Sequence, residues 1–457
     1  MSVVNETQSE KKNLSEYFLQ NPYVSYTYSY PHKSAYHHWN CPKPLKNLWK
    51  EEETSNLFLY FHVPFCVHKC GYCNLFSQIN PHSSIVDSYL NAMKRQSSVV
   101  KKELNKNKTL NINKVAIGGG TPTYLTIDQL NILFKIIEET FQEDLNQVDI
   151  SIETHPDRTN EKILNFLKEK GVDRISVGIQ SFLRKELNAL SRKMDLHHIN
   201  SLLSSIKELS IESLNIDLIY GIANQTVTSF LSSIENALAF EPEEIYIYPL
   251  YIRPKTGLSK NTPKGKDLRL KMYHEGRKRL LQASYTQVSM RHFYNNKVIE
   301  KRNICNGQNN YNCSIDGMIG LGVGARSYTR NFHYSEPYAI SQPSVSHIIR
   351  DFSSRTNDSF KYSTYGIMLS EEDVRRRYIL KNLLRLDGVD LNQYFNLYKS
   401  PLFKDFHELR HLIEADLAFC NSDNLILNQK GISLSDSIGP WFYSERVLTM
   451  MEKFELK

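Results

Sequence analysis

Residues 57–73 read LFLYFHVPFCVHKCGYC, an apolar run that leads directly into three closely spaced cysteines. The apolar part is typical of a parallel strand that is buried on both faces of a sheet. Five further runs of the same kind follow along the chain, with longer helical patterns between them. These runs are residues 114–120, 148–156, 174–181, 214–221 and 244–252.

The segments between the runs carry helix signals. Thr126 and Gln129 form a capping box ahead of an apolar face, and Ile85, Tyr89 and Met93 repeat at helical spacing. Six strand-and-helix repeats with crossovers of this length predict an α/β fold in which a parallel sheet curls into a partial (β/α)6 barrel. A doubly wound open sheet is the alternative, and in either fold ligands bind at the carboxyl ends of the strands.

The rest of the chain predicts separate parts around the barrel. Residues 253–266 have no period and predict a loop, and Ser370 with Asp373 predicts a helix start. Helices and a hairpin around residues 421–424 then predict a winged-helix-like α+β domain. Because this domain lacks a basic recognition face, we expect packing or substrate capping, not DNA binding. The predicted domains are an N-terminal extension packing on the barrel (1–54), the partial barrel (55–255), a barrel extension with substrate-side elements (256–362) and the winged-helix-like domain (363–457).

Composition narrows the class of protein. Of the 457 residues, 40% are hydrophobic and 23% are charged, as in ordinary globular proteins, and the net charge is only +7. The charges are interleaved, so we expect no nucleic-acid partner. No apolar run approaches the roughly 18 residues that a membrane span needs, and the N-terminus lacks the apolar core of a secretory signal. We therefore expect a cytoplasmic protein without a membrane partner.

Seven cysteines, an odd number, do not form a disulfide framework, and three of them lie within eight residues. Cys66, Cys70 and Cys73 form a CxxxCxxC array, and three thiolates on one loop can bind three irons of a cubane cluster and leave the fourth without a protein ligand. A zinc site is the alternative, but it needs four ligands, so His62 or His68 would have to complete it.

Two further features stand at predicted strand ends. Gly118, Gly119 and Gly120 allow the backbone to approach a ligand closely, although a tight turn is the simpler explanation. Glu153 ends a buried strand, where an unpaired carboxylate is costly. It therefore contacts either a ligand or a barrel arginine such as Arg174.

The CxxxCxYC array after a first barrel strand resembles the radical S-adenosylmethionine (radical SAM) superfamily. Further blocks are similar to the oxygen-independent coproporphyrinogen III oxidase group of that superfamily, over about residues 55–330 and in the C-terminal domain. The blocks are LYFHVPFC, GGGTPTYL, SIETHPD, DRISVGIQSF, LNALSRKM, LNIDLIYGIANQT, IGLGVGARSY and SEEDVRRRYILKNLLRLDGVDL.

The resemblance implies that Cys66, Cys70 and Cys73 hold a [4Fe-4S] cluster whose open iron binds SAM. The reduced cluster then cleaves SAM to methionine and a 5′-deoxyadenosyl radical. It also implies a small-molecule substrate and an electron donor such as flavodoxin or ferredoxin. The residues that it assigns to SAM binding are Tyr60, Tyr72, Gly119, Gly120, Thr121, Glu153, Gln180, Arg192 and Asp217.

The resemblance leaves open whether a second SAM molecule binds. Gln308 and Arg326 fall where the resembled oxidase binds its second SAM, but Arg326 replaces an aliphatic residue of that group. The guanidinium would equally suit an acidic substrate. One or two SAM molecules therefore remain alternatives.

The resemblance leaves three functions. The oxidase, which decarboxylates propionate side chains in porphyrin biosynthesis, carries a further Cys where this chain has Leu75. The related haem chaperone carries a His-Asn pair followed by Tyr-Trp, and the corresponding residues 307–312 read GQNNYN, without the His and the Trp. We therefore favour a separate branch that acts on an unidentified substrate, with radical methylation as one possible reaction.

Overall fold

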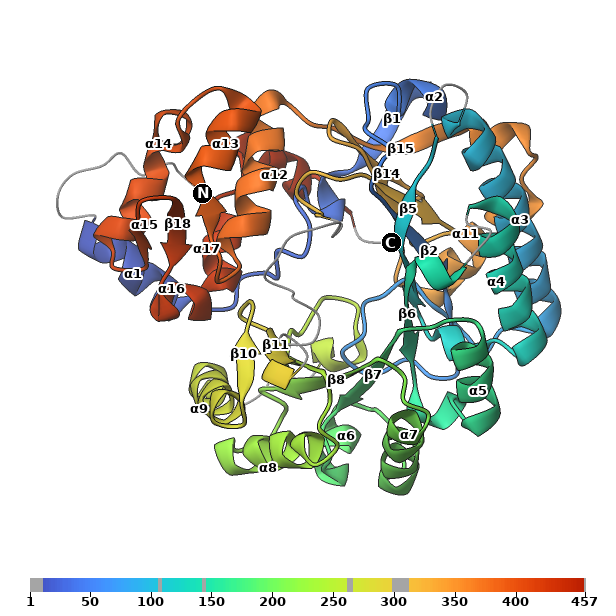
Figure 1. Ribbon diagram of the computed structural model, residues 1–457, viewed down its shortest axis with the longest axis horizontal. Helices are drawn as coiled ribbons and strands as arrows, with labels where there is room; N and C mark the ends of the chain where they lie inside the picture. Colours follow the sequence, from blue (N-terminus) through green and yellow to red (C-terminus); the bar gives the residue numbers. More distant parts are fainter. Residues whose placement is uncertain (1–10, 106–108, 142–144, 261–265, 298–311, 456–457) are drawn as a thin grey trace.

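Six parallel strands form the centre of the fold in a computed structural model, which describes residues 11–105, 109–141, 145–260, 266–297 and 312–455 (Figure 1). Each strand begins and ends within three residues of its predicted bounds. They lie side by side in chain order, without the reversal that a doubly wound sheet requires, so the partial barrel is confirmed. The strands are β2 (Leu57–Val63), β5 (Ile112–Gly119), β6 (Asp149–Thr154), β7 (Arg174–Gln180), β8 (Ser213–Tyr220) and β9 (Glu244–Pro249).

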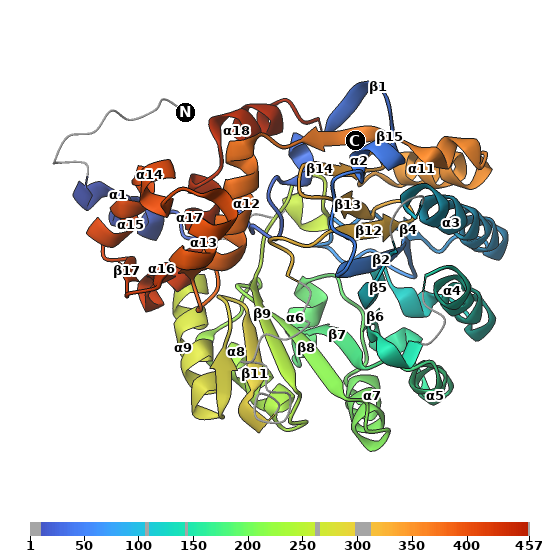
Figure 2. The same cartoon turned by 45° about the horizontal axis from the view of Figure 1, so that its top comes forward.

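Helices cover the outer face of this sheet, as Figures 1 and 2 show. The predicted capping box is present, since Thr126 Oγ1 accepts from the N–H of Gln129 and the Gln129 side chain accepts from the N–H of Thr126. Tyr89 and Met93 point into the core and are fully buried. The outer helices are α3 (Ser83–Leu104), α4 (Ile127–Thr140), α5 (Glu161–Glu169), α6 (Arg184–Ala189), α7 (Leu196–Glu208), α8 (Val227–Leu238) and α9 (Arg269–Gln282).

Further strands extend the sheet at both edges. Beyond β9 lie β11 (His292–Asn295) and β10 (Tyr285–Gln287), both antiparallel to their neighbours. Beyond β2 lies β12 (Met318–Leu321), which is parallel to β2, and four strands follow it in antiparallel pairing. These four are β13 (Arg326–Tyr328), β14 (Phe332–Ser335), β15 (Tyr362–Met368) and β1 (His37–Pro44). The helix α11 (Gln342–Ser354) packs against α3.

The N-terminal extension does more than pack on the barrel. It begins with α1 (Lys11–Gln20), which contacts the C-terminal domain, and it supplies the edge strand β1 and the short helix α2 (Leu45–Leu48). We call residues 21–36, between α1 and β1, the N-terminal arm. No sequence pattern predicted the strand β1, because HHWNCPKP is polar and lies at a sheet edge with an irregular register.

The C-terminal domain contains helices around a three-stranded sheet. Its hairpin of β17 (Ala418–Cys420) and β18 (Asn424–Leu427) is the predicted one, and β16 (Val389–Asp390) pairs with β18. Ahead of the hairpin the helical segment DFHELRHLIEADL, residues 405–417, contains only the short helix α15 (Arg410–Glu414), because the backbone turns away at Phe406, which is buried against Phe442. The helices are α12 (Glu371–Leu383), α13 (Leu391–Tyr398), α14 (Leu402–Asp405), α15 (Arg410–Glu414), α16 (Gln429–Ser433), α17 (Ser435–Trp441) and α18 (Glu445–Glu452).

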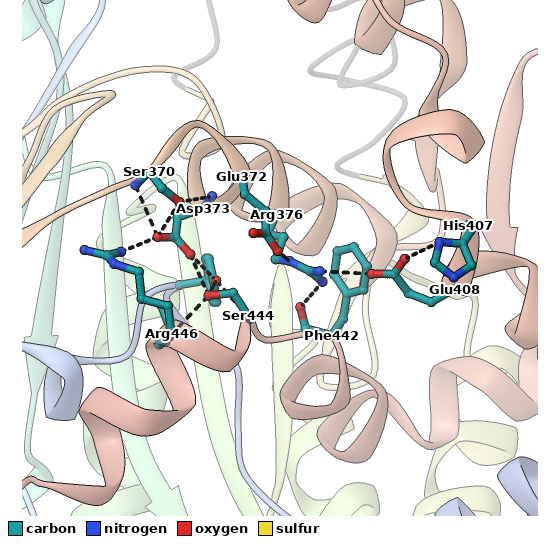
Figure 3. A network of polar contacts seen from close by, with 11 residues as sticks. Ser370, Glu372, Asp373, Arg376, His407, Glu408, Phe442, Ser444 and Arg446 are labelled. Atoms are coloured by element: carbon teal, nitrogen blue, oxygen red, sulfur yellow. Dashed lines mark hydrogen bonds and ion pairs between the residues drawn. The ribbon is translucent and has the colours of Figure 1, made fainter. Parts of the chain in front are cut away.

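A buried carboxylate at the start of α12 joins three parts of the chain (Figure 3). Asp373 is fully buried and accepts from the hydroxyl of Ser444 at 2.7 Å and from the guanidinium of Arg446. It also accepts from the hydroxyl of Tyr30 in the N-terminal arm at 2.8 Å, and it completes the predicted capping box with Ser370. The arm is thereby bonded to the C-terminal domain.

No helix among the described residues is long and apolar enough to span a membrane.

Candidate functional site

One large cavity, of about 1250 Å³, opens at the carboxyl ends of the parallel strands. Its walls come from the ends of β2 and β5–β9, the cysteine loop that follows β2, the N-terminal arm, the strands β12–β14 and the helix α12. The three clustered cysteines line it. So do ten of the eleven residues assigned to SAM binding, namely Tyr60, Tyr72, Gly119, Gly120, Thr121, Glu153, Gln180, Arg192, Asp217 and Arg326. The eleventh, Gln308, lies outside the described residues.

The cysteine loop is fixed at both ends by backbone hydrogen bonds. β3 (Phe65–Cys66) pairs with β4 (Gln78–Ile79) in parallel, which folds the loop back on itself. Inside the loop, the N–H of Gly71 donates to the carbonyl of Leu190 at 2.8 Å, and its own carbonyl accepts from Leu258 at 2.8 Å. The loop is therefore held against the carboxyl ends of the strands.

Donors point at two of the three sulfur atoms. Thr121 Oγ1 donates to Cys66 Sγ at 3.5 Å, and Arg192 Nη1 donates to Cys70 Sγ at 3.1 Å. Burial raises the pKa of the Cys73 thiol to about 12, so this thiol ionises only when it binds a metal or another positive partner. Hydrogen-bond donors around the sulfurs stabilise thiolate ligands of an iron–sulfur cluster.

The same residues do not fit a zinc site. Within the described part of the chain, no three His, Cys, Asp or Glu side chains converge on a single ion. His62 Nε2 donates to the carbonyl of Phe76 at 3.1 Å, so its Nδ1 accepts from the hydroxyl of Tyr60 at 3.2 Å and neither ring nitrogen is free. A cubane cluster needs no such convergence, because each thiolate binds a different iron. The donor set therefore fits the cluster.

The glycine loop at the end of β5 lies directly against the cysteines. A Cβ atom on Gly120 would lie 2.7 Å from the carbonyl oxygen of Phe65 and 3.0 Å from Cys66 Sγ. Gly119 has a φ of +119°, which a residue with a side chain rarely adopts. Its N–H donates to Glu153 Oε2 at 3.0 Å. The glycines thus bring the loop close to both the sulfurs and Glu153.

Two carboxyl groups, Glu153 on β6 and Asp217 on β8, face the cavity from the strands on either side of β7. Burial and the nearby Asp217 raise the pKa of Glu153 to about 7, although the N–H of Gly119 favours the ionised form. Burial raises the pKa of Asp217 to about 6, while the Asn215 amide, which donates to it at 2.8 Å, lowers it. Arg174, the alternative partner of Glu153, instead forms a bidentate pair with Glu244 at 2.9 and 3.0 Å. Glu153 therefore has no barrel arginine as its hydrogen-bond partner.

Arg192 and Gln180 stand on either side of Gly178. The three guanidinium nitrogens of Arg192 bind Cys70 Sγ, the carbonyl of Gly178 and the sulfur of Met194. Gln180 has a φ of +76°, at a bulge where β7 leaves its register with β8. The bulge turns the end of β7 toward the cavity.

The N-terminal arm also lines the cavity, and the sequence analysis assigned it no site residue. Tyr26, Tyr28, His32 and Lys33 all line the wall. The one available signal was the unusual tyrosine-rich stretch NPYVSYTYSYPHKSAYHHW, residues 21–39. Cavity residues from later elements that were also missed include His333 on β14 and Lys381 on the helix α12.

Comparisons with known proteins find similar proteins along most of the chain. Residues 60–236 match the family model of the radical SAM superfamily. The chain is 27% identical to an oxygen-independent coproporphyrinogen III oxidase of Escherichia coli (strain K12), over 83% of this chain and 82% of that protein. It is 25% identical to the heme chaperone HemW of Bacillus subtilis (strain 168), over 84% of this chain and 99% of that protein.

The fold is also that of a solved structure. The coproporphyrinogen III oxidase HemN from Escherichia coli, a radical SAM enzyme, superimposes with a TM-score of 0.72 at 22% identity, covering 90% of this chain and 92% of that one. Residues 60–236 thus match the radical SAM superfamily, and most of the chain's length is similar to the oxygen-independent coproporphyrinogen III oxidase group.

Proposed function

We propose that this protein binds one [4Fe-4S] cluster through Cys66, Cys70 and Cys73 and uses it to cleave SAM, in order to abstract a hydrogen atom from a small substrate. The observation that carries the proposal is the meeting of these thiols, the glycine loop and the polar strand ends in a single cavity. When bound and reduced, the cluster supplies the electron that splits SAM into methionine and a 5′-deoxyadenosyl radical.

The chain's own residues then orient SAM. Asp217 is suited to accept hydrogen bonds from the ribose hydroxyls, and Glu153 to accept from the ribose or the amino group. Arg192 lies beside Cys70, so its positive charge also lies beside a carboxylate that binds next to the cluster. Tyr60 and Tyr72 contribute aromatic walls to the same cavity, where they would pack against the adenine.

The reductant is proposed to be a small electron-transfer protein such as flavodoxin or ferredoxin. The substrate is an unidentified small molecule, because the chain departs from both named relatives. Leu75 is 45% exposed, lines the cavity and stands where the oxidase has a further cysteine. Nothing among the described residues favours methylation over other reactions of the radical.

Two alternatives follow from the similarities. The first is coproporphyrinogen III oxidation, since the E. coli oxidase matches over four fifths of both chains. The second is a haem chaperone, since the match covers 99% of the Bacillus subtilis protein. Haem titration separates the chaperone from the enzymes. We expect no saturable Soret shift at micromolar protein, and a stable one-to-one haem complex would revive the chaperone.

Anaerobic incubation of the reconstituted protein with SAM and dithionite, with and without coproporphyrinogen III, tests the proposal. We expect 5′-deoxyadenosine in both samples and no change in the porphyrinogen. Decarboxylated porphyrin would establish the oxidase, and S-adenosylhomocysteine would establish methylation. The absence of 5′-deoxyadenosine from protein with a full cluster would refute the proposal.

A further inference from the structure

The cavity wall carries an excess of positive charge. Among the described residues that line the cavity, nine are Lys or Arg and four are Asp or Glu. Three of these four carboxylates already accept from donors of the protein, and the fourth, Asp157, is exposed at the rim. The three are Glu153 with Gly119, Asp217 with Asn215, and Glu336 with Arg355. The carboxylates therefore leave several cations uncompensated.

Arg326, at the start of β13, is one of these cations, and its charge interacts with Tyr28 and Tyr36. It lies inside the cavity, and its Nη1 atom is buried without a hydrogen-bond partner. One face of the guanidinium stacks on Tyr28, 4.8 Å from the ring centroid. No carboxylate of the described residues lies within ion-pair distance of it. A buried guanidinium with an unmet donor is costly unless a ligand satisfies it.

Two more side chains near Arg326, Lys33 and His333, are only partly satisfied by the described residues. Lys33 of the N-terminal arm lies 3.1 Å from the ring centroid of Tyr338 and forms no ion pair with a described carboxylate. Burial and the nearby charge of Arg326 both lower the pKa of Lys33, and an anion bound between the two would favour the charged form of Lys33. His333 is 1% exposed, lines the cavity, and its Nε2 has no partner. Its Nδ1 is bonded to the hydroxyl of Tyr36 at 3.3 Å.

We propose that the substrate carries an anionic group, a carboxylate or a phosphate, which binds to Arg326 and Lys33 with His333 beside it. The proposal rests on the proposed function, and it names the substrate class of the same cavity. A planar guanidinium with a free N–H matches the oxygens of either anion, and the adjacent ammonium adds a second charge. The anionic group would supply the hydrogen-bond and ion-pair partners that the protein itself does not provide to these side chains.

The same charges disfavour a second SAM at this place. SAM carries a sulfonium and an ammonium group against one carboxylate, so it is a net cation at neutral pH. Two uncompensated cations repel it, and the low local dielectric of a cavity strengthens the repulsion. The cavity therefore holds one SAM, beside the cluster, together with the anionic substrate.

Binding measurements on the anaerobically reconstituted protein test this subsite. Radiolabelled SAM is counted by equilibrium dialysis, and coproporphyrin III and pyrophosphate serve as the carboxylate and phosphate probes. We expect one SAM per chain, and saturable binding of at least one probe. Losing a hydrogen bond to a charged group costs roughly 1.5–3 kcal/mol, so R326Q should weaken that probe about tenfold or more. K33M should weaken it as well, and R326K should recover part of the loss.

Arg158 provides the matched control, because it lines the rim of the same cavity and donates to the carbonyl of Tyr124. R158Q removes the same charge and should bind the probe as the wild type does. Preferential binding of either probe identifies the anion. Binding of neither probe, an equal loss in R158Q, or two SAM molecules of which R326Q removes one would each overturn the proposal. Cleavage of SAM by the wild type is measured in the same preparation, so failure of the proposed function is recognised separately.

Discussion

Asp217 and Arg192 are the residues whose contacts distinguish a SAM site from a braced barrel. In the structure Asp217 has one donor, Asn215, and otherwise faces the cavity, whereas Arg192 is bonded through all three guanidinium nitrogens. Asp217 is therefore suited to a ligand, and Arg192 both positions Cys70 and lies beside the cluster site. Substitutions at the two positions should consequently have different effects.

Replacing Asp217 with Asn should weaken SAM binding about 10- to 150-fold, because a hydrogen bond to a charged group is worth roughly 1.5–3 kcal/mol. The cluster absorbance and the melting temperature should stay near those of the wild type. Arg192→Lys should weaken SAM binding to a similar extent and also change the cluster spectrum, since Cys70 loses its donor. Equilibrium dialysis and absorbance spectra measure both effects. Normal SAM affinity in an unstable D217N protein would mean that Asp217 is part of the scaffold.

The affinity for SAM should depend on pH through Glu153 and Asp217. Their pKa values are raised to about 7 and about 6, mainly by burial. A cationic ligand favours ionised carboxylates, so protons compete with SAM. Affinity should therefore fall as the pH is lowered through 7 and then 6, and E153Q should remove the upper part of this dependence. If the wild type binds SAM with the same affinity at about pH 6 and at about pH 8, as measured by equilibrium dialysis, the assignment of Glu153 and Asp217 to SAM binding is wrong.

At the scale of elements, the end of β5 lies between the cysteine loop and Glu153, the carboxylate proposed to bind SAM. A Cβ on Gly120 would meet the Phe65 backbone and Cys66 Sγ at 2.7–3.0 Å, and one on Gly118 would meet the Glu153 carboxyl group at 2.9–3.0 Å. A side chain on Gly120 would therefore crowd the cysteine loop, and a side chain on Gly118 would crowd the carboxyl group of Glu153.

Gly120→Ala should therefore reduce the iron content of the reconstituted protein, because the Phe65 backbone cannot yield as a flexible side chain can. Gly118→Ala should leave the iron content unchanged and weaken SAM binding, because it displaces only the end of Glu153. Iron analysis and SAM dialysis on both variants distinguish these effects. Equal iron loss in both would show that the strand end merely tolerates no side chain.

The six central strands could be predicted because each is a continuous apolar run, which needs burial on both faces. The cysteine loop and the glycine loop could be predicted because three closely spaced cysteines and three consecutive glycines each have few structural explanations. The site in the N-terminal arm could not, because Tyr28 and Lys33 are separated from the barrel strands by 20 residues or more and carry no spacing pattern. Likewise, His333 reads as an ordinary strand residue, and only the tertiary structure brings it to Arg326.

At the scale of the whole molecule, the arm closes one side of the cavity and is attached to the C-terminal domain. The attachment is the hydrogen bond from Tyr30 to the buried carboxylate of Asp373. Figure 3 shows Asp373 with its partners Ser370, Ser444 and Arg446. The C-terminal domain therefore contributes to the site. It holds the arm, and its helix α12 supplies Lys381 to the cavity wall.

Tyr30→Phe should lower the free energy of unfolding by about 1–3 kcal/mol, because Asp373 loses a donor while it remains buried. Urea titration followed by circular dichroism measures the change. Tyr17→Phe is the control, because Tyr17 is 45% exposed, and its unfolding should match the wild type. If the two variants unfold alike, the arm is held by its packing and not by this bond.

The central claim, that the three clustered cysteines hold a cluster which cleaves SAM, is tested most directly by the nucleoside product. Reconstituted protein is incubated anaerobically with SAM and dithionite, and 5′-deoxyadenosine is measured by chromatography. We predict that the wild type and Cys313→Ala form it, because Cys313 belongs to the segment before β12 and not to the cysteine loop. Cys66→Ala, Cys70→Ala and Cys73→Ala should not form it. Formation of the nucleoside by any of the latter three, or its absence from the wild type with four irons bound, would contradict the account.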